Sequence, residues 1–169
     1  MPARTARAVG AGLAGAVAYL LAQQVDRRIA NPNSNDLVLL GGPFTSRPRL
    51  RLLIGLVLHL LGGASMGLFF ERYARERLWG PTWLRGIALL QIENTALFPL
   101  VWGMDKGHPA VKSGDLAPMW SRVYFAQQAW RHLALGAVMG AVLGSPPETI
   151  EPAAPLTDLS RFPSFAAPR

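Results

Sequence analysis

Hydrophobic residues are concentrated in four long runs, which polar segments separate. The runs cover about residues 8–25, 52–70, 86–102 and 123–143. Each is close to the roughly 20 residues that a helix needs to cross the hydrocarbon core of a bilayer, and none shows the alternation of a strand. Because lipid offers the backbone no hydrogen-bond partner, helices are the expected spanning elements. The pattern predicts an all-α polytopic integral membrane protein with a bundle of four transmembrane helices.

Composition supports a place in the cell membrane. Half of the 169 residues are hydrophobic and only 16% are charged, which is typical of multi-pass membrane proteins. Four tryptophans fall at predicted span ends, where aromatic residues gather at the interface: Trp79, Trp83, Trp102 and Trp120. The net charge of +7 comes from arginines that flank the spans, so we expect lipid headgroups and not nucleic acid as the partner. The absence of cysteine excludes disulfides and thiolate sites.

The chain divides into a membrane domain, residues 1–144, and a Pro-rich extended tail, residues 145–169. The loop of residues 26–51 carries turn signals, and its apolar stretch 37–40 is expected to dip into the interface. The first span is expected to be retained, because its apolar run continues past the Ala-x-Ala of residues 16–18. Lys and Arg are divided equally between alternate sides, so their count leaves the orientation open.

A nine-residue motif occurs twice, at residues 59–67 and 132–140, with six identical positions. Each copy begins with a histidine inside an apolar run, which is a functional-site candidate because buried ionisable groups are costly in lipid. The copies lie two spans apart and therefore run in the same direction. Two repeated helical hairpins would explain the motif, and chance similarity in sequence rich in Gly, Ala and Leu is the alternative.

Glycines at four-residue spacing form a stripe on two of the predicted helices. In lipid, close approach across small residues drives helix association. We therefore expect the second and fourth spans to contact each other through their glycine faces, with dimerisation as the alternative. These faces comprise Gly55, Gly63 and Gly67 in the second span and Gly136, Gly140 and Gly144 in the fourth.

Polar and ionisable residues inside three of the spans fall at a similar depth, at 1.5 Å of rise per residue. We expect Glu93 and Arg131 to form an ion pair, because neither charge is tolerable alone in lipid. The alternative is a protonatable Glu93 with a histidine relay beside it. The predicted intramembrane polar cluster comprises His59, Gln91, Glu93, Asn94, Gln128, Arg131 and His132.

No cofactor or metal is expected. A haem held between His59 and His132 is the alternative, because the two histidines lie at matching depth. His108 is expected to be a solvated loop residue. Sequence signatures of soluble enzymes, such as Gly-x-Ser-x-Gly and phosphate-binding Gly-rich loops, are absent, and we expect no enzymatic activity.

The layout resembles uncharacterised small bacterial inner-membrane proteins with four spans. The similarity lies in a histidine followed by spaced glycines in the second span (His59, Gly63, Gly67), and in a glutamate followed by a proline in the third (Glu93, Pro99). The resemblance covers about residues 51–144 and implies a membrane protein without naming an activity.

Three functions follow as hypotheses. The first is a non-enzymatic structural or accessory subunit of a membrane assembly, with a membrane-protein partner or a second copy of the chain. The second is a small proton-coupled transporter or channel centred on Glu93. The third is a haem- or pigment-binding redox subunit that uses His59 and His132.

Overall fold

Each predicted hydrophobic run forms a long helix in the computed structural model, which describes residues 2–144. All four helices begin before the predicted runs, and the described residues contain no strand. The predicted tail lies outside these residues. The elements are α1 (Pro2–Ile29), α2 (Asp36–Gly41), α3 (Pro48–Phe69), the π-helical turn η1 (Phe70–Ala74), α4 (Thr82–Gly107), α5 (Pro109–Lys112) and α6 (Arg122–Gly144).

Three of these helices, and not the predicted four, are long and apolar enough to cross a membrane. They cover Ala3–Ile29, Pro48–Ala74 and Thr82–Gly107 within the described part of the chain. The fourth, α6, falls short because Gln127, Gln128, Arg131 and His132 lower the hydropathy of its first half. The composition therefore indicates a multi-pass helical membrane protein with three candidate spans.

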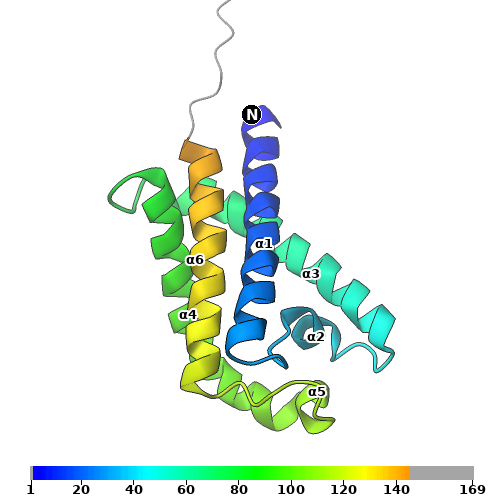
Figure 1. Ribbon diagram of the computed structural model, residues 1–169. Coiled ribbons are helices and arrows are strands. Elements are labelled where there is room, and N and C mark those ends of the chain that lie inside the picture. Colours follow the sequence, from blue (N-terminus) through cyan, green and yellow to red (C-terminus); the bar gives the residue numbers. More distant parts are fainter. Residues whose placement is uncertain (1, 145–169) are drawn as a thin grey trace, which may run out of the picture.

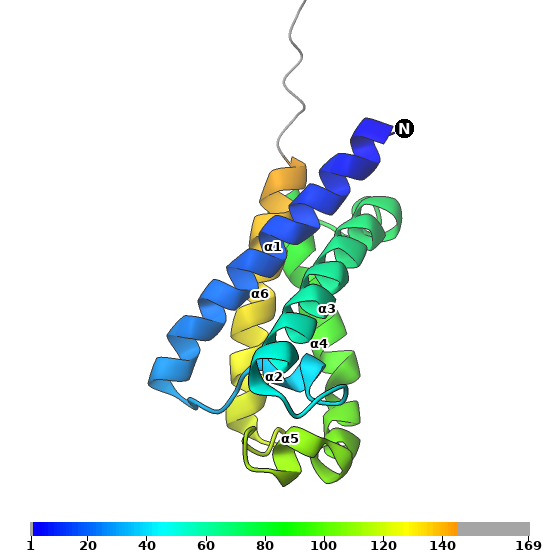
Figure 2. The ribbon, with the colours of Figure 1, turned by 90° about the vertical axis from the view of Figure 1, so that its right-hand side faces the viewer.

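The long helices run up and down in alternation (Figures 1 and 2). α1 and α4 descend from one end of the bundle, and α3 and α6 return to it. Figure 1 shows α4, α6 and α1 side by side, with α3 crossing behind α1. α6 packs against both α1 and α4, whereas α3 packs mainly on α1 and α2. The apolar core gathers around α6, where Leu135, Met139 and Leu143 are buried against Tyr19 and Phe70.

The glycine faces pack within each hairpin, so the predicted contact between the second and fourth spans through them is wrong. A Cβ added to Gly12 of α1 would lie less than 3.0 Å from the carbonyl oxygen of Gly63 on α3. A Cβ added to Gly86 of α4 would meet the carbonyl oxygen of Gly136 on α6 in the same way. The spacing of the glycines predicted a close approach of helices at these positions, but it did not predict which helix lies opposite.

The remaining motif glycines strengthen the equivalence of the two hairpins. Gly67 approaches the carbonyl oxygen of Ala8, and Gly140 approaches that of Thr82. Equivalent contact positions are therefore 74 residues apart between α1 and α4, and 73 residues apart between α3 and α6. The other two stripe glycines differ, since Gly55 accommodates the backbone of α2 at Leu37 and Gly144 meets only a side chain.

The short helices close the other end of the bundle (Figure 2). α2 packs against α3, and a small apolar cluster of Val38, Ala110 and Leu116 joins α2 to α5 and the loop after it. Arg51 Nη1 donates to Asp115 Oδ2 at 2.7 Å, and this hydrogen bond lowers the pKa of the Asp115 carboxyl. The predicted loop of residues 26–51 is thus partly helical and tied to the bundle.

Gly12→Ala and Gly86→Ala should each destabilise the bundle, because the added Cβ would overlap backbone of the partner helix. Overpacking of this kind costs about 1–3 kcal/mol, which should lower the midpoint of thermal unfolding in detergent by several degrees. Gly10→Ala and Gly103→Ala are matched controls on the same helices, since a Cβ there meets nothing within 4 Å. Equal midpoints for all four variants would contradict the two equivalent interfaces.

Candidate functional site: a buried arginine network and a half-open cavity

A fully buried arginine on α6 organises the polar interior. Arg131 binds Asp26 through two hydrogen bonds, from Nε to Oδ2 and from Nη2 to Oδ1, each 2.6 Å long. Its Nη1 also donates to Asp36 Oδ2 at 2.9 Å. The side chain of Arg131 has no solvent exposure. A guanidinium and a carboxylate joined in this bidentate way form one of the strongest polar contacts in proteins.

The other donors of Arg131 are satisfied as well. Nη2 reaches the hydroxyl of Ser34 at 3.0 Å and its carbonyl oxygen at 3.1 Å, and Nη1 lies 3.4 Å from Gln23 Oε1. Gln127 Nε2 donates to Asp26 Oδ1, and Gln128 Nε2 donates to Asp36 Oδ1. The network therefore ties α1, the segment after it, α2 and α6 together.

The predicted ion pair between Glu93 and Arg131 is wrong. Arg131 faces α1 and α2, whereas its neighbour His132 faces α4, because successive residues on a helix point about 100° apart. His132 Nε2 lies 3.1 Å from Glu93 Oε2. The true partners, Asp26 and Asp36, lie at the end of α1 and the start of α2, outside the runs in which intramembrane charges were sought.

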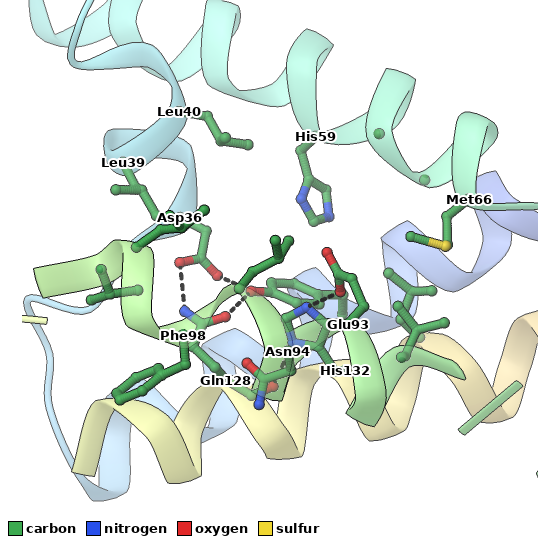
Figure 3. A pocket seen from close by; sticks show the side chains of 18 of the residues that line it. Asp36, Leu39, Leu40, His59, Met66, Glu93, Asn94, Phe98, Gln128 and His132 are labelled. Carbon is green, nitrogen blue, oxygen red and sulfur yellow. Dashed lines mark hydrogen bonds and ion pairs between the residues drawn. The ribbon is translucent and has the colours of Figure 1, made fainter. Parts of the chain in front are cut away.

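A half-open cavity of about 450 Å³ lies on the other side of α6, lined mainly by α3, α4 and α6, with α2 at one end (Figure 3). Most of its wall is apolar, including Leu39 and Leu40 of α2, Leu58 of α3, and Leu97 and Val101 of α4. Its polar lining comprises Tyr19, Asp36, His59, Glu93, Asn94, Tyr124, Gln128 and His132. The interior thus combines apolar walls with one polar region.

The two motif histidines converge on a tyrosine that sequence reasoning missed. The ring of Tyr19 on α1 lies 4.9 Å from that of His59 and 5.3 Å from that of His132, measured between centroids. The Tyr19 hydroxyl contacts the carboxylate of Asp36 and lies 2.5 Å from Gln128 Oε1. Tyr19 therefore connects the cavity to the arginine network.

Hydrogen bonds to backbone carbonyls define which ring nitrogens carry protons. A carbonyl oxygen only accepts, so His132 Nδ1 donates to Gln128 at 2.7 Å, and His59 Nε2 donates to Ala16 at 3.0 Å. Figure 3 shows His59 projecting from α3 toward Glu93 on α4. The other nitrogen of the His132 ring, Nε2, lies beside Glu93.

Two polar atoms of the cavity lining lack an aligned hydrogen-bond partner. Glu93 Oε2 and Asn94 Nδ2 are both buried and unpaired, although His132 lies close to the first. An unsatisfied buried polar group costs about 1–3 kcal/mol, and such groups in a cavity are typical of a site that a ligand or water completes.

The predicted polar cluster is brought together only in part. His59, Glu93, Asn94, Gln128 and His132 line the cavity. Gln91 instead donates to the carbonyl oxygen of Ala129 on α6. Arg131 belongs to the arginine network, between α6 and the segments α1 and α2. Asp36 could have been suspected, since Asn35 caps a short apolar helix that begins there.

His108, predicted to be solvated, is buried. Its Nε2 lies 2.8 Å from the carbonyl oxygen of Leu39, and its Nδ1 accepts from the backbone of Ala110. It caps α5 and joins that helix to α2, which is a structural role.

The residues do not fit a haem held between His59 and His132. Tyr19 packs against both rings, and His132 has both nitrogens engaged, by Gln128 and by Glu93. Within residues 2–144, no group of three potential ligands could hold a metal ion.

No family model, curated protein or solved structure matches the chain.

Arg131→Met should destabilise the protein by about 3–5 kcal/mol, because it leaves Asp26 and Asp36 buried without a counter-charge. Adding Asp26→Asn to that variant should restore part of the loss, as a double-mutant cycle of thermal or denaturant unfolding in detergent would show. Arg122→Met is the control, since Arg122 lies exposed at the start of the same helix. Equal destabilisation by both methionine substitutions would refute the role of the network.

Proposed function

We propose that the chain is a non-enzymatic multi-pass membrane protein that binds a small amphiphilic molecule in the cavity between α3 and α4. The observation that carries the proposal is the cavity itself, with apolar walls and a polar region containing unpaired atoms. Its volume of about 450 Å³ lies within the range of about 300–1,000 Å³ that small-molecule sites have.

The position of the cavity favours a ligand that arrives from the bilayer. Leu97 and Leu100 line it and are 49% and 63% exposed on the outer surface of α4. Exposed leucines on a candidate span face lipid. A molecule dissolved in the bilayer could therefore pass between α3 and α4 with its polar group directed at Glu93 and the histidines.

This proposal includes a membrane position for α6, in addition to the three apolar helices. Gln127, Gln128 and Arg131 of α6 are buried inside the bundle, as are Leu135 and Met139 further along the helix. α1 and α4 cover the helix on two sides. Helices shielded in this way need not be apolar, since their polar groups meet protein and not lipid.

A role as an accessory subunit in the cell membrane is compatible with ligand binding. A substitution that fills the cavity tests the binding. Gly62 of α3 lines the cavity, and a Cβ added to it meets nothing within 4 Å.

Gly62→Leu should therefore fill part of the cavity without disturbing the bundle. We expect it to weaken binding of phenylpropanol, a small neutral amphiphile, about tenfold or more, as measured by calorimetry on the protein in lipid nanodiscs. Gly103→Leu is the control, because that glycine is also on open surface but does not line the cavity. Undiminished binding in Gly62→Leu would place the ligand elsewhere.

Proton conduction is a second candidate, because ionisable groups form a series across the interior. Glu93 contacts His132, the ring of His132 packs on Tyr19, and Tyr19 contacts Asp36, which Arg131 joins to Asp26. Such series mark proton pathways in membranes. Glu93→Gln should then abolish proton flux into liposomes while the protein still inserts. A flux through the unaltered protein equal to that of empty liposomes would exclude this function.

A further inference from the structure

We propose that the ligand of the cavity is an organic cation with an apolar body, and that its binding releases a proton held by Glu93 and His132. The inference rests on the proposed binding function and specifies its ligand class and its coupling to pH. Four observations carry it: the charges of the lining, the neighbours of those charges, the proton on His132, and the rings around the site.

The cavity is lined by two carboxylates and by no lysine or arginine. The carboxylates are Asp36 and Glu93, and the described residues of the lining include no other group with a permanent charge. Arg131 compensates them only in part, because its one charge is shared between Asp26 and Asp36. The network already has one carboxylate more than its guanidinium, and Glu93 adds another.

Uncompensated negative charge inside a membrane protein is costly, so protons or a cation must neutralise it. The titratable groups that face Glu93 are His132 of α6 and His59 of α3. Tyr19 of α1 and Asp36 of α2 lie beyond them on the same cavity. The only counter-charges on these elements that face the site are therefore protons on the two histidines.

The short distance between His132 and Glu93 favours one proton on the pair. Because Nδ1 donates to the carbonyl oxygen of Gln128, a neutral ring carries no proton on Nε2, which lies 3.1 Å from Glu93 Oε2 without an aligned hydrogen bond. A proton on Nε2, or on the carboxyl group itself, offsets the negative charge of Glu93 at that distance.

A cation beside Glu93 makes that proton unfavourable. As the cationic group approaches the carboxylate, the proton leaves the pair for bulk water, His132 becomes neutral, and the charge of the site stays constant. Oε2, which has no aligned donor in this structure, then contacts the cation. Binding thus exchanges one proton for one organic cation, with no change in covalent bonds.

Aromatic rings provide the rest of a site for a cation. Tyr19, Phe98 and Tyr124 line the cavity with Glu93, and the faces of aromatic rings attract cations, quaternary ammonium groups among them. The apolar wall of leucines and Met104 suits a hydrocarbon body. An anionic ligand would meet two carboxylates here and no fixed positive charge.

The test compares three probes that share one phenylpropyl body: phenylpropyltrimethylammonium, phenylpropanol and phenylbutyrate. Binding to the full chain in nanodiscs of neutral lipid is measured by calorimetry between about pH 5 and about pH 8, where histidine normally changes charge. The quaternary head keeps its charge throughout, so any pH dependence reports on the protein. Titrations in two buffers of different ionisation enthalpy count the protons released.

We expect the cation to bind at least tenfold more tightly than the alcohol and the anion. Its affinity should rise by up to about tenfold per pH unit, with one proton released, because rising pH removes the competing proton. Glu93→Gln should abolish the preference and the pH dependence but still bind phenylpropanol. Glu76→Gln, a change at an exposed carboxylate that does not line the cavity, should alter neither.

Equal affinities for the three probes, or a cation affinity independent of pH, would overturn this inference and leave the proposed amphiphile site intact. Failure of all three probes to bind would instead overturn the proposed function. If Glu93→Gln does not fold, the cation preference and the proton count of the unaltered protein decide the question alone.

Discussion

The interior of this protein depends on the charge of one buried guanidinium. Arg131 cannot lose its proton at physiological pH, and its burial away from solvent demands carboxylates. Asp26 and Asp36 supply them, and they lie on either side of the turn that follows α1. To reach Arg131, the chain after α1 must fold back into the bundle. α2 is thereby held against α3, where it closes one end of the cavity.

The same constraint explains why α6 is the long helix without a stretch apolar enough to be a candidate span. It lies between α1 and α4 and presents Arg131 to one side and His132 to the other. Hydropathy describes the free energy of moving side chains from water to lipid. The polar side chains of α6 move instead from water into contact with protein. Its polar residues are satisfied by neighbours, so low hydropathy in this helix reflects its central position and not a weak place in the bundle.

Much of the fold could be predicted from the sequence, because apolar runs and spaced glycines act locally. The four helices and the close approach at Gly63 and Gly136 followed from those patterns. The partner of Arg131 did not, because the prediction sought counter-charges only inside apolar runs. Asp36 reaches the interior because the segment after α1 folds back into the bundle. That segment has the composition of a loop, and composition does not show where a loop packs.

The cavity arises from a difference between two similar hairpins. The equivalent glycine contacts relate positions of α3 and α6 by an offset of 73 residues, which pairs Leu135 with Gly62. On α6, Leu135 is buried and packs against Gly15 of α1. On α3, Gly62 has no side chain to occupy the corresponding space, and the cavity lies beside it.

The offset of 74 residues between α1 and α4 likewise pairs Tyr19 with Glu93. The first hairpin thus carries an aromatic ring where the second carries a carboxylate, and both side chains line the cavity. Close packing alone would favour a large side chain at Gly62 as well. A missing leucine beside an added carboxylate instead leaves the partly polar space that the proposed ligand would occupy, so the difference between the hairpins supports that proposal.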